Sequence, residues 1–169
     1  MVISMLVVLG AVAVVLLLVP RTNSVVQPPV DVARGAVAAA EQVDFTPSVP
    51  TGLPSDWRAT SVRTTRSTAG VLTWHAGYQT SSDQYAAVEQ GQDAPAEWVR
   101  AQTNRAPTAG TVDLVGRTWT RYVRTDKVQN SLVSTSGGVT TVVTGTAGFD
   151  ELGQARPEPA PAALTPGPS

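Results

Sequence analysis

The sequence predicts an α+β protein in which one N-terminal transmembrane helix precedes a small antiparallel-sheet domain with packed helices. Three observations carry this prediction. Residues 2–19 are an uninterrupted apolar run without a charged side chain. The rest of the chain is rich in Thr and Val, which favours strands. Its segments read as helix, three strands, helix, four strands, helix, and the short turns between consecutive strands favour antiparallel pairing.

The apolar run from Val2 to Val19 is long enough to cross a bilayer, since about 17 apolar residues can suffice. Inside lipid the backbone must satisfy its own hydrogen bonds, so this segment is expected to be a helix. Pro20 and Arg21 end it. No basic residue precedes the run, and no small-x-small motif follows it closely, so we expect an uncleaved anchor over residues 1–21 rather than a secretory signal.

The first part of the soluble region is expected to be a spacer and a helix. Residues 22–30 are polar and contain proline, which predicts an extended linker before a domain over residues 31–155. Asp31 is expected to cap a helix from Val32 to about Gln42. Its apolar stripe is narrow, so we expect it to dock lightly; the stripe consists of Val32, Ala36, Ala39 and Val43.

Three strands are expected next. Residues 46–54 hold three prolines and a glycine, which predicts irregular structure. Strands are predicted from Trp57 to about Arg66, from Val71 to Thr80 and from Tyr85 to Gln90. The second strand has the most regular pattern. It places Leu72, Trp74, Ala76 and Tyr78 on one face and Thr73, His75, Gly77 and Gln79 on a polar face.

A helix is predicted after the third strand. Asp93 is expected to cap it, with Pro95 in its first turn. Trp98 and Ala101 are expected to face the core, and Ala106–Pro107 is expected to end the helix.

Four more strands and a short helix complete the domain. Strands are predicted from Thr111 to Val115 and from Arg117 to Thr125, with Gly116 as a tight turn or bulge. Asn130–Thr135 and Val139–Thr144 are expected to form a hairpin. A last short helix is expected to start near Phe149. Prolines then recur at 157, 159, 161, 166 and 168, so residues 156–169 are predicted to be a disordered tail without helix or sheet.

Composition argues against several classes of function. The 12 basic and 13 acidic residues give a net charge of -1, which offers no electrostatic footprint for nucleic acid. The absence of cysteine excludes disulfides, thiolate metal sites and cysteine nucleophiles. One histidine leaves mainly carboxylates as metal ligands, and no calcium-loop or phosphate-loop motif is present. We therefore expect neither a metal nor a cofactor.

His75 is the only histidine and the one candidate for catalysis. It could act as a general base, with Asp83 or Glu89 orienting it and a Ser or Thr as nucleophile. The sequence has neither a Gly-x-Ser-x-Gly elbow nor a Ser-x-x-Lys motif. A hydrogen-bonded or exposed strand histidine is the simpler interpretation, so we predict no catalytic residue.

Two further groups of side chains admit a binding role. The tryptophans could line a ligand groove, but the favoured interpretation is that they form the core; they are Trp57, Trp74, Trp98 and Trp119. Three arginines around Trp119 and Tyr122 could recognise an anionic partner or lie along an exposed strand; they are Arg117, Arg121 and Arg124.

Four short segments resemble an actinobacterial family of single-pass membrane proteins, the domain of unknown function family 4245. They are residues 52–57, 73–78, 116–119 and 142–147. The resemblance runs from the anchor to Leu152. It implies a domain outside the cytoplasmic membrane and supplies no catalytic residues. Family members usually carry a basic stub before the anchor and a longer last helix than this sequence predicts. The element order also resembles, more weakly, the sandwich of small secreted Mog1/PsbP-type proteins.

We therefore expect a membrane-anchored, extracytoplasmic, non-enzymatic domain that binds a partner in the cell envelope or has a structural part there. Arg21 alone, by the positive-inside rule, would lie in the cytoplasm, so the outward orientation depends on the resemblance. The alternative is an envelope hydrolase that uses His75. A pocket with His75 at its floor and a carboxylate within reach would favour the enzyme. A filled core with a flat polar sheet would favour the binding domain.

Overall fold

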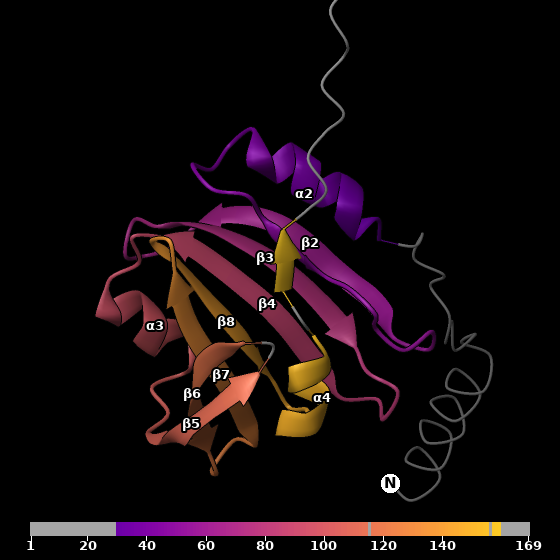
Figure 1. Ribbon diagram of the computed structural model, residues 1–169, viewed down its shortest axis with the longest axis vertical. Helices are drawn as coiled ribbons and strands as arrows, with labels where there is room; N and C mark the ends of the chain where they lie inside the picture. Colours follow the sequence, from indigo (N-terminus) through magenta and orange to yellow (C-terminus); the bar gives the residue numbers. More distant parts are fainter. Residues whose placement is uncertain (1–29, 115, 156, 160–169) are drawn as a thin grey trace, which may run out of the picture.

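A seven-stranded antiparallel sheet dominates the computed structural model, which describes residues 30–114, 116–155 and 157–159 (Figure 1). Its strands are β2 (Arg58–Arg66), β3 (Leu72–Gln79), β4 (Tyr85–Gln92), β5 (Thr108–Leu114), β6 (Arg117–Arg124), β7 (Gln129–Ser136) and β8 (Val139–Gly145). The helices are α2 (Val32–Ala40), α3 (Ala96–Gln102) and α4 (Phe149–Gln154). A small second sheet pairs β1 (Ser48–Pro50) with β9 (Pro157–Pro159).

The sheet consists of two meanders joined side by side. The strand order is β2-β3-β4-β8-β7-β6-β5, so the first and second meanders meet where β4 pairs with β8. Gly137 and Gly138 both have positive φ, 57° and 79°, which a tight two-residue hairpin turn between β7 and β8 requires. The predicted α+β class and the predicted order of the main strands and helices are therefore confirmed.

The small sheet corrects two sequence predictions. Proline content predicted no regular structure over residues 46–54 and after Arg156, yet Val49 pairs with Glu158 and Pro50 with Pro157. Proline cannot donate to a sheet ladder, but it is tolerated at sheet edges. In a ribbon of two three-residue strands every position is an edge position, so the prolines do not prevent this pairing.

One face of the main sheet packs against α2 and α4. Figure 1 shows α2 lying across β2 and β3. Asp31 caps α2 by accepting a hydrogen bond from the Arg34 backbone N–H at 2.9 Å. The predicted stripe of α2 is buried, but its docking is close rather than light. A Cβ atom on Gly35 would lie 2.7 Å from Val62 Cγ1, so glycine is needed for the helix to approach β2 this closely.

The opposite face is covered in part by α3, whose geometry differs from the prediction. Pro95 is the N-cap residue, and Asp93 instead lies in a turn with φ 48° and donates its backbone N–H to Gly138 O. Trp98 is fully buried, but Ala101 is exposed. In a helix of seven residues, the one large buried side chain sets which way the helix faces, and Ala101 then points outward.

Within the described part of the chain, no helix has the length and apolar character needed to span a membrane. The predicted anchor over residues 1–21 and the linker up to residue 29 lie outside that part. Of the predicted tail, only residues 157–159 are described.

Candidate functional sites

His75 lies at the centre of a hydrogen-bonded chain on the sheet face opposite α2. In the register, β3 places it between Arg63 of β2 and Glu89 of β4. Its Nδ1 atom lies 2.6 Å from Glu89 Oε1, and its Nε2 atom lies 2.9 Å from Ser61 Oγ. Because a carboxylate only accepts hydrogen bonds, Nδ1 carries the proton, and Nε2 of a neutral ring then accepts from the Ser61 hydroxyl.

The structure distinguishes between the two predicted partners of His75. Glu89 is the carboxylate in contact with it, whereas Asp83 lies in the β3–β4 turn and accepts a hydrogen bond from Gln79 Nε2 at 3.0 Å. Ser61 was not named from the sequence. Its position next to His75 depends on a register shift between Ala59 and Ser61. A bulge of this kind leaves no clear mark on the local residue pattern.

Gly77 makes this cluster possible. A Cβ atom at that position would lie 2.6 Å from Ser61 Oγ, 2.8 Å from the Tyr85 hydroxyl and 3.1 Å from His75 Nε2. Three polar atoms therefore converge over the bare backbone of one glycine. Burial and the nearby charge of Glu89 raise the pKa of Tyr85, while Arg63 and a hydrogen bond with Ser61 lower it. The net shift of the Tyr85 pKa is upward.

Serine, histidine and glutamate in this order have the connectivity of a nucleophilic triad. Other features of the site differ from such an enzyme. His75 is only 2% exposed, and the Tyr85 hydroxyl lies 3.5 Å from the same Nε2 atom. Ser61 lies within a strand, whose backbone N–H groups point along the plane of the sheet and not toward its face. An oxyanion hole needs such donors aimed at the reacting oxygen.

A second site lies on the other face of the sheet, where α4 meets β5, β6 and β7. It is a cavity of about 510 Å³. Its lining includes four apolar side chains and two charged ones: Val112, Leu114, Leu132, Phe149, Arg121 and Asp150. The Arg121 guanidinium carbon lies 4.0 Å from the centre of the Phe149 ring, so the cation stacks on the aromatic wall of α4.

Arg121 has unused hydrogen-bonding capacity in this cavity. Its Nε atom is buried and has no hydrogen-bond partner. Within the described residues, no carboxylate oxygen lies within 4.0 Å of the guanidinium nitrogens, although Asp150 lines the same cavity. The site therefore presents a cation with a stacked face and, among the described residues, no carboxylate in contact.

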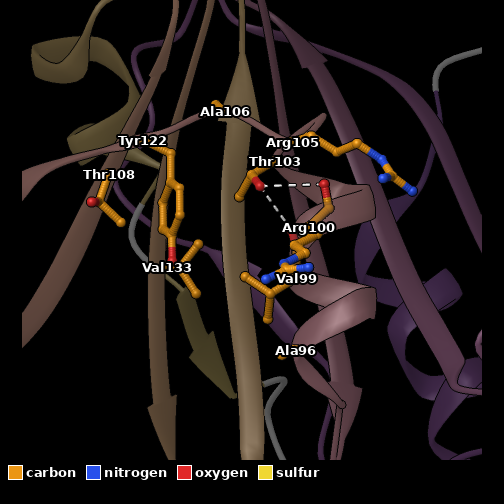
Figure 2. Close-up of a pocket in the computed structure, with 9 residues that line it drawn as sticks. All are labelled: Ala96, Val99, Arg100, Thr103, Arg105, Ala106, Thr108, Tyr122 and Val133. Carbon is orange, nitrogen blue, oxygen red and sulfur yellow. Dashed lines mark hydrogen bonds between the residues drawn. The ribbon is translucent and has the colours of Figure 1, made fainter.

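A third site, a cavity of about 590 Å³, lies beside α3 and shows a different arrangement (Figure 2). Tyr122 and Val133 form part of its wall. Two of its polar side chains are paired within the protein: Thr103 Oγ1 donates to Val99 O at 2.9 Å, and Arg105 pairs with Glu97 at 3.0 Å. Figure 2 shows the Arg105 side chain extending away from Tyr122. Among the described residues, no polar side-chain atom that lines this cavity is both buried and without a partner, in contrast to Arg121 Nε.

The other residues singled out from the sequence are not gathered at one site. The tryptophans are core residues, as favoured, with exposures of 8%, 1%, 0% and 4% for Trp57, Trp74, Trp98 and Trp119. Arg117 lies over Trp119, and Arg121 follows on the same face of β6. Arg124 lies on the opposite face, where it pairs with Asp126 at 2.7 Å. The three arginines therefore do not form a single anion-binding patch.

No group of three or more potential metal ligands occurs among the residues that the structure describes. Over residues 1–155, the chain matches the family described as "Protein of unknown function (DUF4245)". The chain belongs to the DUF4245 family. No curated protein and no solved structure matches it. Membership of DUF4245 confirms the family that the Trp-containing segments indicated, and the description of that family names no activity, ligand or partner.

Proposed function

We propose that this DUF4245 protein is a membrane-anchored, non-enzymatic binding domain that faces outside the cytoplasmic membrane. The observation that carries the binding role is the half-buried Arg121 side chain, whose buried Nε atom has no partner, in a largely apolar cavity. The apolar run at residues 2–19 supports the anchor, and the resemblance of the sequence to single-pass membrane proteins supports the location.

Burying a polar group without a hydrogen-bond partner lowers the stability of a fold. A buried donor without a partner costs on the order of 1–3 kcal/mol, and more when the group is charged. Arg121 could be replaced by an apolar side chain at no loss of any hydrogen bond among the described residues. A ligand that supplies the missing hydrogen-bond acceptor would account for an arginine at this position. Such pockets, mainly apolar with a few placed polar groups, are typical of small-molecule sites.

Photocrosslinking in native membranes tests this proposal. The photoreactive amino acid p-benzoylphenylalanine replaces Leu114 in the Arg121 cavity, and in a matched control it replaces Val99 in the cavity beside α3. We expect irradiation of the full chain to give a covalent adduct of small-molecule mass from position 114 and none from position 99. A folded protein that gives no adduct from position 114 would overturn the binding role at this cavity.

The location has a separate test, which uses the absence of cysteine from the chain. Replacing the exposed Lys127 by cysteine gives one thiol on a turn of the domain. We expect a membrane-impermeant maleimide to label this variant in intact cells, with the cysteine-free parent as the blank. Labelling only after the membrane is permeabilised would place the domain in the cytoplasm.

A second candidate function is an envelope hydrolase, favoured by the Ser61–His75–Glu89 distances. In that case Ser61 Oγ would attack an electrophile while His75 Nε2 takes its proton. A fluorophosphonate probe, from which an activated serine displaces fluoride, decides between the two functions. The binding proposal expects no labelling above that of the Ser61→Ala variant. Labelling of the parent that the variant loses would establish the hydrolase.

A further inference from the structure

We infer that the ligand of the Arg121 cavity is an amphiphile with a single carboxylate headgroup and an apolar body. This inference rests on the proposed binding function and specifies its chemistry. It draws on three features of the cavity: the way in which Arg121 is held, the presence of a second charge, and the nature of the walls.

The geometry of Arg121 points to a planar oxyanion. Phe149 covers one face of the guanidinium at 4.0 Å, so a ligand can reach the group through its edge. That edge carries parallel N–H donors in a fixed fork, which matches the two oxygens of a carboxylate. Neither a hydroxyl nor an amide oxygen supplies this charge and this paired geometry.

The negative charge of Asp150 in the same cavity favours a headgroup with a single negative charge. Asp150 lines the same cavity and is exposed on α4. A phosphate monoester carries nearly two negative charges at neutral pH, and this site has one cation and one like charge to offer it. A carboxylate neutralises Arg121 once and meets less repulsion from Asp150.

The walls define the rest of the ligand. Val112, Leu114, Leu132 and Phe149 present apolar surface around the cation. A volume of about 510 Å³ lies within the range of roughly 300–1,000 Å³ that small-molecule sites occupy. The cavity therefore suits a medium-length acyl carboxylate, in which burial of the chain adds to the charged contact.

The test uses the full chain in phosphatidylcholine nanodiscs with two photoreactive probes, a diazirine-bearing dodecanoic acid and the alcohol of the same length. Peptide mass spectrometry locates the labelled positions. We expect the acid to label residues of β5 and α4, to be displaced by unlabelled dodecanoate, and to label at least about tenfold more strongly than the alcohol. That ratio corresponds to the lower end of the value of a hydrogen bond to a charged group.

Three variants refine the result. Arg121→Met should reduce labelling by the acid at least about tenfold, Asp150→Asn should increase it, and Arg100→Met, beside the α3 cavity, should leave it unchanged. If Arg121→Met proves unfolded by circular dichroism, the comparison of the two probes on the parent and on Asp150→Asn still decides the matter.

Equal labelling by acid and alcohol would overturn the carboxylate inference, as would weaker labelling of Asp150→Asn. A third probe, the phosphate ester of the same diazirine-bearing alcohol, tests the headgroup: labelling stronger than that by the acid would also overturn the inference and would identify a phosphate headgroup instead. In any of these cases, an adduct from p-benzoylphenylalanine at position 114 would leave the binding function standing. Its absence would remove both proposals.

Discussion

The two faces of the sheet treat buried polar groups in opposite ways. On one face, Ser61, His75 and Glu89 form a closed chain in which both histidine nitrogens have partners. On the other face, Arg121 is held beside Phe149 with its Nε atom unpaired. The Ser61–His75–Glu89 cluster therefore has a structural role, because its hydrogen bonds stabilise the pairing of three strands. An unsatisfied group in a cavity indicates a partner from outside the chain.

Tyr78 shows why the cavity matters to this distinction. Its hydroxyl is also buried without a hydrogen-bond partner, and burial raises its pKa to about 12. Tyr78 lies in the main core beside Trp57 and lines neither of the two cavities described above. The residue is only 4% exposed, and its unpaired hydroxyl is a cost of packing in the core. An unpaired polar atom therefore points to binding only where the side chain that carries it lines a cavity, as Arg121 does.

The largest loss of stability is expected from a substitution in the core. Trp74→Ala should destabilise the domain by about 3–5 kcal/mol, as for other large buried aromatic residues. Trp74 is 1% exposed, and its Nε1 atom donates to Ser48 O at 3.0 Å. Urea denaturation followed by fluorescence of the remaining tryptophans gives the value. A loss below about 0.5 kcal/mol would be typical of a surface residue and would contradict this packing.

The next largest loss of stability is expected from a substitution in the Ser61–His75–Glu89 cluster. Glu89→Ala removes the acceptor of His75 Nδ1 and leaves a buried donor unpaired, which should cost about 1.5–3 kcal/mol. Glu89→Gln is the matched control, since its amide oxygen can still accept from Nδ1, and it should cost less. Urea denaturation of both variants measures the difference. Equal stability of Glu89→Ala and the parent would mean that the cluster does not stabilise the sheet.

Parts of both faces could be predicted from the sequence. The alternation in Val71–Thr80 gave the side of the sheet on which Trp74 and His75 each lie, because the period of a strand is two. From the sequence, Asp83 or Glu89 was expected to be the partner of His75, and Glu89 is the one in contact. The alternation could not identify Ser61, whose place depends on a bulge in β2. The β1–β9 pairing joins segments that are far apart in the sequence, and no local pattern marks it.

The Arg121 cavity could be predicted only in part. The sequence drew attention to three arginines near Trp119, and strand alternation separates Arg124 from the other two. Which arginine lines a cavity depends on how α4 packs beside β7 and β8, and that arrangement is a property of the tertiary structure. The hydrophobic pattern of α4 shows that it packs but not where it leaves space.

The unpaired Tyr78 hydroxyl in the core should make stability depend on pH. The pKa of Tyr78 is about 12 in the folded protein and about 10 when unfolded, so above pH 10 the unfolded state binds fewer protons and stability falls as pH rises. Tyr78→Phe removes this loss, and at pH 12 it should be more stable than the parent by about 2 kcal/mol. At pH 7 we expect little change. Urea denaturation across pH 7–12 measures both, and parallel pH profiles would contradict the prediction.

The smallest effect on stability is expected at the site with the largest proposed effect on binding. Arg121→Met keeps an unbranched side chain over Phe149 but removes the guanidinium. Two changes then oppose each other: the stacking of the cation on Phe149 is lost, which is worth about 0.5–2 kcal/mol, and the cost of an unpaired buried donor disappears. We expect the free energy of unfolding without ligand to change by less than about 0.5 kcal/mol. Urea denaturation of Arg121→Met and of Glu89→Ala measures the contrast, since each variant removes one charge. Loss of the Glu89 charge should destabilise the Ser61–His75–Glu89 cluster, whereas loss of the Arg121 charge should leave the stability of the domain nearly unchanged. A loss above about 1.5 kcal/mol would show that Arg121 stabilises the fold as Glu89 does, and the difference between the two faces would no longer indicate a ligand.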